Sequence, residues 1–501
     1  MRGIDLVAGL NGAAARGLPS VWQTLCGIEI AGITADSRQV TPGFLFAALP
    51  GARADGRDFI AEAVARGAVA VLAPPGTAWP ETAPPRPLIE DPCVRRRLAE
   101  LAARLAGPQP RLIAAVTGTN GKTSTVAFLR QIWAASGYRA ASLGTLGVEV
   151  GPGHDGGSRG VAPPASLTTP DPVALAETLA ALARDGIDHA AMEASSHGLD
   201  QCRLDGVRLA AAGFTNLTRD HLDYHGSLEA YRAAKLRLFD TLLPPGAPAI
   251  ATAELDPDTL AALRAIAIAR RLDLRTVGEA GDTLRVIAAH PRPDGQDLIL
   301  ARPDGVRRTV AFPLPGRFQA DNALLAAALA EALGEPDALS RLPGLTGVRG
   351  RLELAASPGG ACAYVDYAHT PDALARLLAA LRPHTAGRLV LVFGAGGDRD
   401  RGKRPLMGAE AARGADLVFV TDDNPRTEDP AAIRAAILAA CAGAIEIGDR
   451  EAAIAAGLNA LRPGDVLVVA GKGHEPGQIV GTVTIPFDDA AVIRRLAGGG
   501  A

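Results

Sequence analysis

The sequence is poor in cysteine and shows no regular cysteine spacing. Five cysteines lie far apart and never form a C-x-x-C pair: Cys26, Cys93, Cys202, Cys362 and Cys441. An odd number of scattered cysteines argues against a disulfide framework and against the common zinc-binding motifs. A reducing compartment is therefore expected.

Long apolar runs and an excess of one charge are also missing. The first residues, MRGIDLVAGLNG, contain no sustained apolar stretch, and no segment approaches the roughly 18 apolar residues of a membrane helix. Acidic and basic residues are interspersed and the net charge is only -3, which predicts no binding face for nucleic acid or for an anionic membrane. We expect a soluble, cytoplasmic protein, by default a monomer, whose partners are small molecules.

The chain is too long for a single hydrophobic core. Its 501 residues, 48% of them hydrophobic, are enough for about three domains. Two stretches rich in glycine and proline, GPQP at 107–110 and LPGLTGVRGR at 342–351, are candidate joints. They predict three domains, at residues 1–108, 109–347 and 348–501.

A glycine-rich turn opens the second of these pieces. The segment VTGTNGKTSTVAF (116–128) follows the apolar run RLIAAV and leads into STVAFLRQIWAA, whose apolar residues have helical spacing. Strand, loop and helix in this order are the context of a phosphate-binding loop, whose backbone N–H groups, lysine and hydroxyl bind phosphates and Mg²⁺.

The loop departs from the strict pattern G-x-x-x-x-G-K-[ST] in one position. Val116 stands where that pattern has its first glycine, and the other glycine is Gly118. We interpret Gly118, Gly121, Lys122 and Thr123 as a variant phosphate loop. The alternative is an ordinary strand-to-helix turn with an exposed lysine.

Two further segments could supply metal ligands. Glu193 follows the apolar run IDHAAM and would lie at a strand end, where it is either a second Mg²⁺ ligand or a structural partner. The segment FTNLTRDHLDYHGS brings Asp220, His221, Asp223 and His225 within six positions. Such a cluster fits a metal site and a solvated turn equally well.

Lys235 falls on an apolar helical stripe. In SLEAYRAAKLRLFD, Ser227 is a candidate N-cap, and Tyr231, Lys235 and Phe239 follow at helical spacing. Two outcomes are open: the lysine extends its ammonium to the surface, which is the commoner case, or desolvation lowers its pKa and leaves a nucleophilic neutral amine. A neutral amine could react with CO₂ and become an anionic Mg²⁺ ligand.

The last piece repeats one pattern four times, in which an apolar strand ends in a polar motif. The pairs are CAYV with DYAHTPD, LVLVF with GAGGDRDRGKR, LVFV with TDDNPR and VLVVA with GKGHE, separated by alanine-rich helical runs. This alternation predicts a parallel α/β sheet, in which all four motifs face one crevice beyond the carboxyl ends of the strands.

The motifs of this crevice suit an amino acid. Arg399 occupies the last glycine position of a dinucleotide loop and so argues against one, but it supplies a cation. Arg426 lies beside Asn424 on a turn stiffened by Pro425, and Glu475 suits an ammonium. Any single motif could instead form surface ion pairs, but the three together predict a pocket for a zwitterion.

Ten motifs in order resemble the Mur ligase family of peptidoglycan synthesis. They are TGTNGKTS, LTTPD, MEASSHGL, TNLTRDHLDYHG, YRAAK, GVRGRLE, DYAHTPD, GGDRDRGKR, DDNPR and GKGHE. The segment ADSRQVTPGFLFAALPG (35–51) also resembles the uridine-binding domain of that family, so the resemblance spans nearly the whole chain. It implies an α/β protein with a uridine-binding N-terminal domain, a central P-loop-type ATPase domain with a mostly parallel sheet, and a C-terminal Rossmann-like domain.

The resemblance implies an ATP-dependent amide ligase. ATP, with Mg²⁺, would phosphorylate the carboxylate of a UDP-MurNAc-dipeptide, and an amino acid would attack the acyl phosphate. The D-N-P-R form is associated with meso-diaminopimelate, whose distal carboxylate needs Arg426; a relative that adds L-lysine should lack this arginine.

Roles carry over residue by residue. Nucleotide contacts are expected from Gly118, Thr119, Asn120, Gly121, Lys122, Thr123, Ser124, Asn322, Arg351, Asp366 and His369. Metal ligands are expected to be Thr123, Glu193, His221 and carbamylated Lys235, of which the last three, together with Lys122, are the catalytic candidates. Contacts with the UDP-linked substrate are expected from Ser37, Thr168, Thr169, Ser195, Gln201 and Arg203. Contacts with the amino acid are expected from Arg399, Asp423, Asn424, Pro425, Arg426, Gly471 and Glu475.

One position departs from the family pattern, and three other functions stay open. Gln319 stands where the family usually has asparagine, which is expected to alter a contact near the nucleotide. The alternatives are an L-lysine-adding ligase, a folylpolyglutamate synthetase-like ligase, which should lack the uridine motif and D-N-P-R, and a P-loop ATPase switch, which would hydrolyse ATP without either organic substrate.

Overall fold

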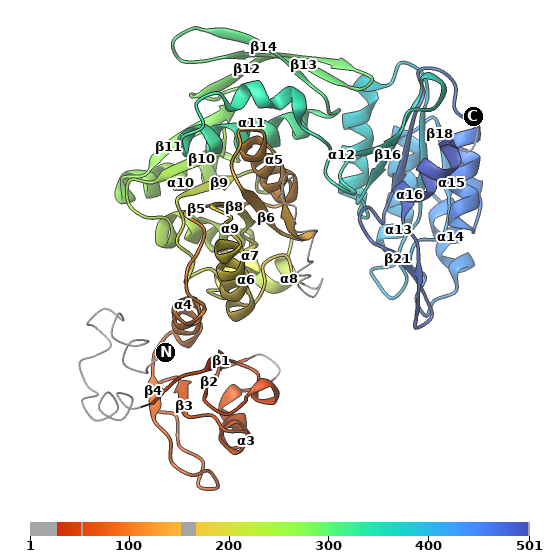
Figure 1. The fold of residues 1–501 in the computed structure, drawn as a ribbon. Coiled ribbons are helices and arrows are strands. Elements are labelled where there is room, and N and C mark those ends of the chain that lie inside the picture. Colours follow the sequence, from red (N-terminus) through yellow and green to blue (C-terminus); the bar gives the residue numbers. More distant parts are fainter. Residues whose placement is uncertain (1–27, 52–53, 152–166, 499–501) are drawn as a thin grey trace. The chain divides into compact units, whose positions relative to one another are not determined.

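The computed structural model describes residues 28–51, 54–151 and 167–498 (Figure 1). Cys26 and the N-terminal stretch MRGIDLVAGLNG lie outside the described residues. Backbone contacts divide the chain into two compact units. The first consists of Met1–Lys122, Trp133–Ala251 and Leu255–Leu274, and the second of Thr123–Ile132, Thr252–Glu254 and Arg275–Ala501. The predicted domain boundaries at 108 and 347 stay predictions.

The first unit begins with a four-stranded parallel sheet in the order β1-β2-β3-β4. Its elements are β1 (Gly32–Thr34), η1 (Ser37–Gln39), β2 (Phe44–Ala47), η2 (Gly56–Phe59), α3 (Ile60–Ala65), β3 (Ala70–Ala73), β4 (Leu88–Glu90) and α4 (Val94–Ala106). Alternate strand residues enter two cores: Leu45 and Leu72 pack with α4, and Phe46 and Val71 pack with α3. Burial on both faces explains why the strands read as continuous apolar runs.

The central sheet has ten strands in the order β14-β13-β12-β11-β10-β9-β5-β8-β6-β7. Its strands are β5 (Leu112–Thr117), β6 (Ala140–Gly144), β7 (Gly147–Val150), β8 (His189–Glu193), β9 (Ala211–Phe214), β10 (Pro248–Thr252), β11 (Asp273–Gly278), β12 (Leu284–Arg292), β13 (Gly295–Ala301) and β14 (Arg307–Phe312). The inner strands from β6 to β10 are parallel, and β7, β13 and β14 pair antiparallel with their neighbours. The predicted mostly parallel sheet is confirmed.

The helices of this region carry five of the predicted site residues, namely Lys122, Thr123, Ser124, Lys235 and Asn322. These helices are α5 (Lys122–Ala135), α6 (Pro172–Arg184), α7 (Ser196–Asp200), α8 (Leu222–His225), α9 (Leu228–Arg237), η3 (Leu238–Leu242), α10 (Pro257–Arg270), α11 (Arg317–Ala332) and η4 (Ala338–Gly344). The predicted N-cap of α9 is confirmed, because Ser227 Oγ accepts a hydrogen bond from Ala230 N at 3.1 Å. None of the described helices is both long and apolar enough to cross a lipid bilayer.

The C-terminal sheet has six strands in the order β15-β16-β20-β17-β18-β19. Its elements are β15 (Glu353–Ala356), η5 (Pro358–Gly360), β16 (Cys362–Asp366), α12 (Pro371–Leu381), η6 (Arg382–His384), β17 (Leu389–Phe393), α13 (Lys403–Gly414), β18 (Leu417–Val420), α14 (Pro430–Leu438), β19 (Ile445–Glu446), α15 (Arg450–Asn459), β20 (Val466–Ala470) and α16 (Asp489–Gly498), with a hairpin of β21 (Gly477–Val480) and β22 (Val483–Pro486). Within the six-stranded sheet, all pairings except that of β15 with β16 are parallel, and the hairpin of β21 and β22 is antiparallel.

Helices lie on both faces of this sheet (Figure 1). Leu389, Leu391 and Phe393 pack with α12, α13 and α14, while Val390 and Val392 pack with α15 and α16. Because β16, β20, β17 and β18 run parallel, their four motifs emerge at one edge, as the sequence predicts.

Candidate functional site

The loop between β5 and α5 has the backbone of a phosphate cradle. Gly118 and Gly121 adopt φ angles of +143° and +84°, which a residue with a Cβ rarely adopts. A Cβ on Gly118 would lie 1.9 Å from Thr215 Oγ1. Lys122, the first residue of α5, donates from Nζ to the carbonyl oxygens of Gly118 and Thr119, both at 2.8 Å. The ammonium and the positive end of the helix therefore face the loop, where a phosphate would bind.

The segment after β9 braces this loop. Thr215 Oγ1 donates to Asn120 O at 2.6 Å, and Asn216 Oδ1 accepts from Asn120 N at 2.9 Å. Thr119 Oγ1 accepts from Thr218 N at 3.0 Å. The sequence predicts this segment only as part of a candidate metal cluster, and the threonine and asparagine spacing of TNLT is the signal for its supporting role.

Lys235 is buried and does not extend to the surface. Its side chain is 1% exposed, and Nζ donates to the carbonyl oxygen of Gly118 at 2.8 Å. Nζ also lies 4.4 Å from the centre of the Tyr231 ring. Burial, reinforced by the nearby Lys122 ammonium, holds the pKa of Lys235 well below its usual range. Of the two outcomes left open by the sequence, the structure shows the desolvated amine; carbamylation itself stays a prediction.

Glu193 is held at the end of β8 by the turn after β6. Its Oε1 accepts from Thr145 N at 2.7 Å, and its Oε2 accepts from Thr145 Oγ1 at 3.3 Å. A Cβ on Gly144 would lie 2.0 Å from Oε1, so only glycine fits there. Gly144 and Thr145 were not predicted from the sequence. They fix a carboxylate that is 2% exposed.

The remaining predicted metal ligand, His221, lies among aromatic rings. It caps α8 with a left-handed φ of 51°, is about half exposed, and its Nε2 lies 3.6 Å from Asp220 Oδ2. Its ring centre is 4.9 Å from that of His197. Within the described ranges, no group of three or more His, Cys, Asp or Glu side chains is placed to hold a metal ion. A Mg²⁺ site beside phosphates needs only one or two protein oxygens, and the carboxylate of Glu193 at the end of β8 is of that kind; metal binding by Thr123, Glu193, His221 and Lys235 stays a prediction.

The residues predicted to contact the UDP-linked substrate fall into two groups. Thr169 Oγ1 donates to Glu193 O and accepts from Ser195 N, both at 3.0 Å. Arg203 donates to Thr169 O at 2.6 Å and to Gln201 Oε1 at 2.7 Å. These residues therefore brace one another beside the end of β8.

The other two predicted substrate contacts, Thr168 and Ser37, form side-chain hydrogen bonds of their own. Thr168 Oγ1 accepts from Thr145 Oγ1 at 3.3 Å. Ser37 lies in the N-terminal sheet region, where its Oγ donates to Glu62 Oε2 at 2.9 Å. Contact of any of these residues with a substrate stays a prediction.

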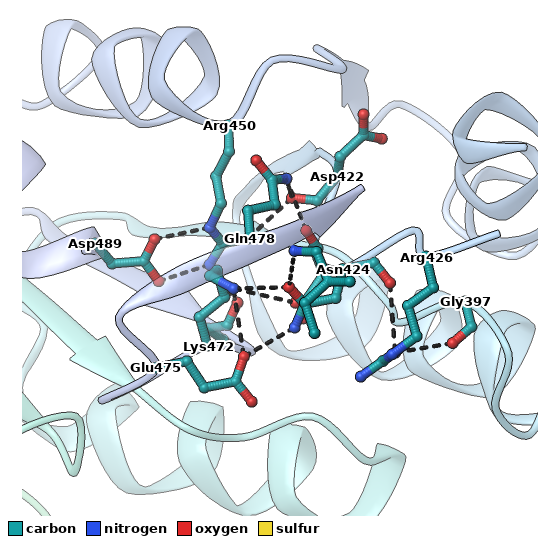
Figure 2. A network of polar contacts seen from close by, with 12 residues as sticks. Gly397, Asp422, Asn424, Arg426, Arg450, Lys472, Glu475, Gln478 and Asp489 are labelled. Atoms are coloured by element: carbon teal, nitrogen blue, oxygen red, sulfur yellow. Dashed lines mark hydrogen bonds and ion pairs between the residues drawn. The ribbon is translucent and has the colours of Figure 1, made fainter. Parts of the chain in front are cut away.

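The C-terminal strand ends form a polar network (Figure 2). Asn424 donates from Nδ2 to Glu475 Oε2 at 2.8 Å, and its Oδ1 accepts from Lys472 Nζ at 3.0 Å and from Ile479 N at 2.9 Å. Lys472 is fully buried and was not among the predicted site residues. Two donors on one side of the amide and one acceptor on the other fix the orientation of Asn424.

Arg426 is presented in a strained conformation. Its φ is +54°, and its backbone is bonded to the hairpin through Arg426 N to Ile479 O at 3.0 Å and Gly481 N to Arg426 O at 2.7 Å. Nη1 donates to Gly397 O at 2.8 Å, while Nε and Nη2 form no hydrogen bond within the part of the chain that the structure describes. Strain of this kind persists where the surroundings enforce it and is frequent at ligand sites.

The loops that carry Arg399 and Arg426 are clamped together. Asp398 accepts from Thr427 N at 3.1 Å and from Thr427 Oγ1 at 2.8 Å, and Asp398 N donates to Glu428 Oε1 at 2.6 Å. A Cβ on Gly397 would lie 1.9 Å from Pro425 O. Two predicted cationic positions therefore share one rigid support.

A buried ion pair lies beneath the network. Arg450 and Asp489 are both fully buried, and Arg450 Nη2 also donates to Ala470 O at 3.1 Å. Burial raises the pKa of Asp423, against the opposing charges of Arg450 and Lys472. A Cβ on Gly471 would lie 2.7 Å from Asp423 Oδ2.

Four residues that are predicted to contact the nucleotide lie near the first strands of the C-terminal sheet or on α11. Asp366 accepts from Leu352 N and Ala368 N, both at 2.8 Å, and burial raises its pKa. His369 Nδ1 lies 2.8 Å from Tyr367 O.

Arg351 and Asn322 complete this set. Arg351 Cζ lies 4.6 Å above the Tyr367 ring. Gln319 Nε2 donates to Arg351 O at 3.0 Å, while its buried Oε1 has no partner among the described residues. Asn322 lies on the same helix and is buried.

Three family models match the chain along its length. They are described as Mur ligase family, catalytic domain (residues 29–106), Mur ligase middle domain (residues 116–330) and Mur ligase, glutamate ligase domain (residues 350–473).

Curated relatives are similar over nearly the whole chain. A protein of Caulobacter vibrioides named UDP-N-acetylmuramoyl-L-alanyl-D-glutamate--2,6-diaminopimelate ligase is 57% identical, covering 94% of this chain and 96% of its own. A Rhizobium meliloti protein of the same name is 54% identical over 94% of this chain and 95% of its own.

Solved structures share the fold. One titled as a structure of UDP-N-acetylmuramoyl-L-alanyl-D-glutamate--2,6-diaminopimelate ligase has a TM-score of 0.70 at 35% identity and covers 94% of this chain and 95% of its own. MurF ligase from Thermotoga maritima in complex with ADP has a TM-score of 0.60 at 18% identity, covering 94% and 98%. Mycobacterium tuberculosis folylpolyglutamate synthase complexed with ADP and AMPPCP has a TM-score of 0.60 at 21% identity, covering 81% and 95%.

Proposed function

The chain belongs to the Mur ligase family and has its three-domain architecture, and we propose that it joins meso-diaminopimelate to UDP-N-acetylmuramoyl-L-alanyl-D-glutamate at the expense of ATP. The observation that carries this choice of amino acid is Arg426, held by the hairpin with two nitrogens not engaged by the described residues. A guanidinium suits the distal carboxylate of meso-diaminopimelate and would repel the terminal ammonium of L-lysine. Relatives with this activity in their names include proteins that are 51–57% identical.

The first step is phosphoryl transfer from ATP to the free carboxylate of the UDP-linked dipeptide. The loop N–H groups from Gly118 to Thr123 and the Lys122 ammonium bind the phosphates and stabilise the charge that develops on them. Mg²⁺, when bound, neutralises phosphate charge; Thr123, Glu193, His221 and carbamylated Lys235 would hold it. Glu193 is kept in place for this by Thr145.

Lys235 takes part as a carbamate in this proposal. Only a neutral amine attacks CO₂, and burial, which lowers the pKa of Lys235, favours that form. The attack forms an N–C bond and releases one proton, so the neutral amine becomes an anionic carbamate. An anion beside the phosphate loop would attract Mg²⁺ rather than compete with it.

The second step is attack of the amino group on the acyl phosphate, which releases phosphate and forms the amide. Glu475, oriented by Asn424, binds the ammonium end of the amino acid, and Arg399 and Arg426 bind its carboxylates. The amine must lose its proton before it attacks, and the phosphate leaves with the C–O bond electrons. Binding both ends of the zwitterion orients the nucleophile, which is the main contribution expected of the protein.

Phosphate release with each substrate omitted in turn tests the proposal. We expect release only when ATP, the UDP-linked dipeptide and meso-diaminopimelate are all present, in the cytoplasmic range of pH and salt. Release with ATP alone would favour an ATPase switch. Release with a folate and glutamate would favour a folylpolyglutamate synthase, whose fold this chain shares.

A further inference from the structure

Lys472 is a lysine that cannot reach water. Its side chain is 0% exposed, and its ammonium lies 3.0 Å from Asn424 Oδ1, 3.3 Å from Glu475 Oε2 and 3.9 Å from Asp423 Oδ1 (Figure 2). A buried ammonium is costly unless several acceptors surround it. Four of the 51 basic residues of the chain are lysine, at positions 122, 235, 403 and 472. The chain has arginine at most of its basic positions, but position 472 has lysine, whose ammonium is a compact point charge rather than a planar guanidinium.

The contacts of Lys472 orient two residues that the amino acid would contact. Because Lys472 Nζ and Ile479 N both donate to Asn424 Oδ1, the Nδ2 group of Asn424 faces Glu475 and donates to its Oε2. Lys472 Nζ reaches the same Oε2. Oε1 of Glu475 forms no hydrogen bond within the described part of the chain, and the Glu475 side chain is 34% exposed. Oε2 of Glu475 is thus fixed by Lys472 and Asn424, and Oε1 is left for a ligand.

We propose that Lys472 is a positioning residue for amino-acid binding, which acts by holding Glu475 and Asn424 so that Glu475 Oε1 faces the ammonium of the incoming amino acid. This inference rests on the proposed function. Lys472 does not touch the substrate and takes no part in phosphoryl transfer. Its removal leaves Glu475 with one donor fewer and leaves Asp423 with Arg450 as its main nearby cation.

The test separates amino-acid binding from the phosphoryl-transfer half of the reaction. In Lys472→Met we expect the KM for meso-diaminopimelate to rise at least about tenfold, as for loss of one charged hydrogen bond. The KM values for ATP and the UDP-linked dipeptide should stay within about twofold. Without amino acid, reversal of the phosphoryl transfer carries labelled ADP into ATP. This exchange, which depends on the UDP-linked dipeptide, should be retained in the variant.

Two controls make the result specific. Arg388 forms an ion pair with the buried Asp465 at 2.7 Å. The two residues directly precede β17 and β20, so the pair lies at the ends of these strands opposite to the site. Arg388→Met should therefore lower the melting temperature without changing the KM for the amino acid. In a double-mutant cycle, adding Lys472→Met to Glu475→Gln should raise this KM by less than about twofold, because the lysine acts through the glutamate.

The outcomes that overturn the proposal are distinct from failure of the proposed function. An unchanged KM for the amino acid in Lys472→Met, or additive effects in the cycle, would assign the lysine a merely structural role. Failure of both Lys472→Met and Lys472→Gln to fold while Arg388→Met folds would do the same. If the wild type does not use meso-diaminopimelate, the proposed function fails, and the same comparison is made with the amino acid that it does use.

Discussion

The Nζ atom of Lys235 lies 2.8 Å from the carbonyl oxygen of Gly118, and the two residues are 117 positions apart in the chain. The contact places a buried amine against the phosphate loop, where a second lysine, Lys122, already donates to the same carbonyl. Burial is the main reason for the lowered pKa of Lys235, and the positive charge of Lys122 at the same carbonyl adds to it, because two ammonium groups there would repel each other. Conversion of one of them into a carbamate would remove this repulsion.

Carbamylation of Lys235 is therefore expected. With ¹³C-labelled bicarbonate, the wild type should show one slowly exchanging carbamate signal by ¹³C NMR, and Lys235→Met should lack it. The assignment is simple because the chain has only four lysines. Lys403→Met is the matched control and should keep the signal. Lys235→Met should also lower kcat at least about 100-fold, a loss typical for removal of a group that stabilises the transition state. A carbamate signal that persists in Lys235→Met would contradict the assignment.

Gly118→Ala should disrupt the phosphate loop. The new Cβ would meet Thr215 Oγ1 at 1.9 Å, and the φ of +143° is itself unfavourable for alanine. We expect ATP affinity, measured by calorimetry, to fall by more than about tenfold and stability to fall by about 2 kcal/mol. Gly344→Ala is the control, because nothing lies within 4 Å of its added Cβ. Normal ATP binding by Gly118→Ala would show that the loop does not bind the phosphates.

Arg426→Ala should lose the distal carboxylate contact. Removing one partner of a charged pair costs about 2–5 kcal/mol, so the KM for meso-diaminopimelate should rise about 30-fold or more. Arg413→Ala is the control: this arginine lies on α13, is 70% exposed and pairs with Glu410. Steady-state kinetics of the two variants make the comparison. Equal KM values for them would exclude Arg426 from the pocket.

The stability difference between the wild type and Asp321→Asn should depend on pH. Burial raises the pKa of Asp321 to about 6 against the opposing effect of Arg317. The folded state then binds more protons than the unfolded state between about pH 4 and 6, so the wild type loses stability as the pH rises through this window. Asp321→Asn cannot ionise. The melting temperature of Asp321→Asn minus that of the wild type should therefore be larger at pH 7.5 than at pH 4.5. The same difference at both pH values would contradict the raised pKa.

Local patterns made the fold class and the phosphate loop predictable. The apolar run Leu389–Phe393 ends in glycines, and its alternate residues enter two cores, as expected for a strand covered by helices on both faces. The helical spacing of Val126, Leu129 and Trp133 likewise corresponds to buried positions of α5. Such features depend on neighbours in the sequence, and they could be inferred without knowledge of the strand order.

The supporting residues of the site could not be predicted in this way. Thr145 reaches Glu193 across 48 positions because β6 and β8 are neighbours in the sheet, and the sequence does not state that order. Lysine side chains are almost always exposed, so the sequence gives no sign that Lys472 is buried in the site. Its burial depends on three acceptors brought together from two strand ends. For Lys235 two outcomes are open from the sequence, and its burial in the folded chain decides between them.

A competition between two amino acids tests the central claim most directly. The purified protein, ATP, Mg²⁺ and the UDP-linked dipeptide are incubated with equal concentrations of meso-diaminopimelate and L-lysine, and the UDP-linked products are separated and identified by mass. We predict that nearly all of the product carries meso-diaminopimelate, with a preference of at least about 100-fold from the arginine contact alone. Comparable amounts of the two products, or an excess of the lysine product, would contradict the account.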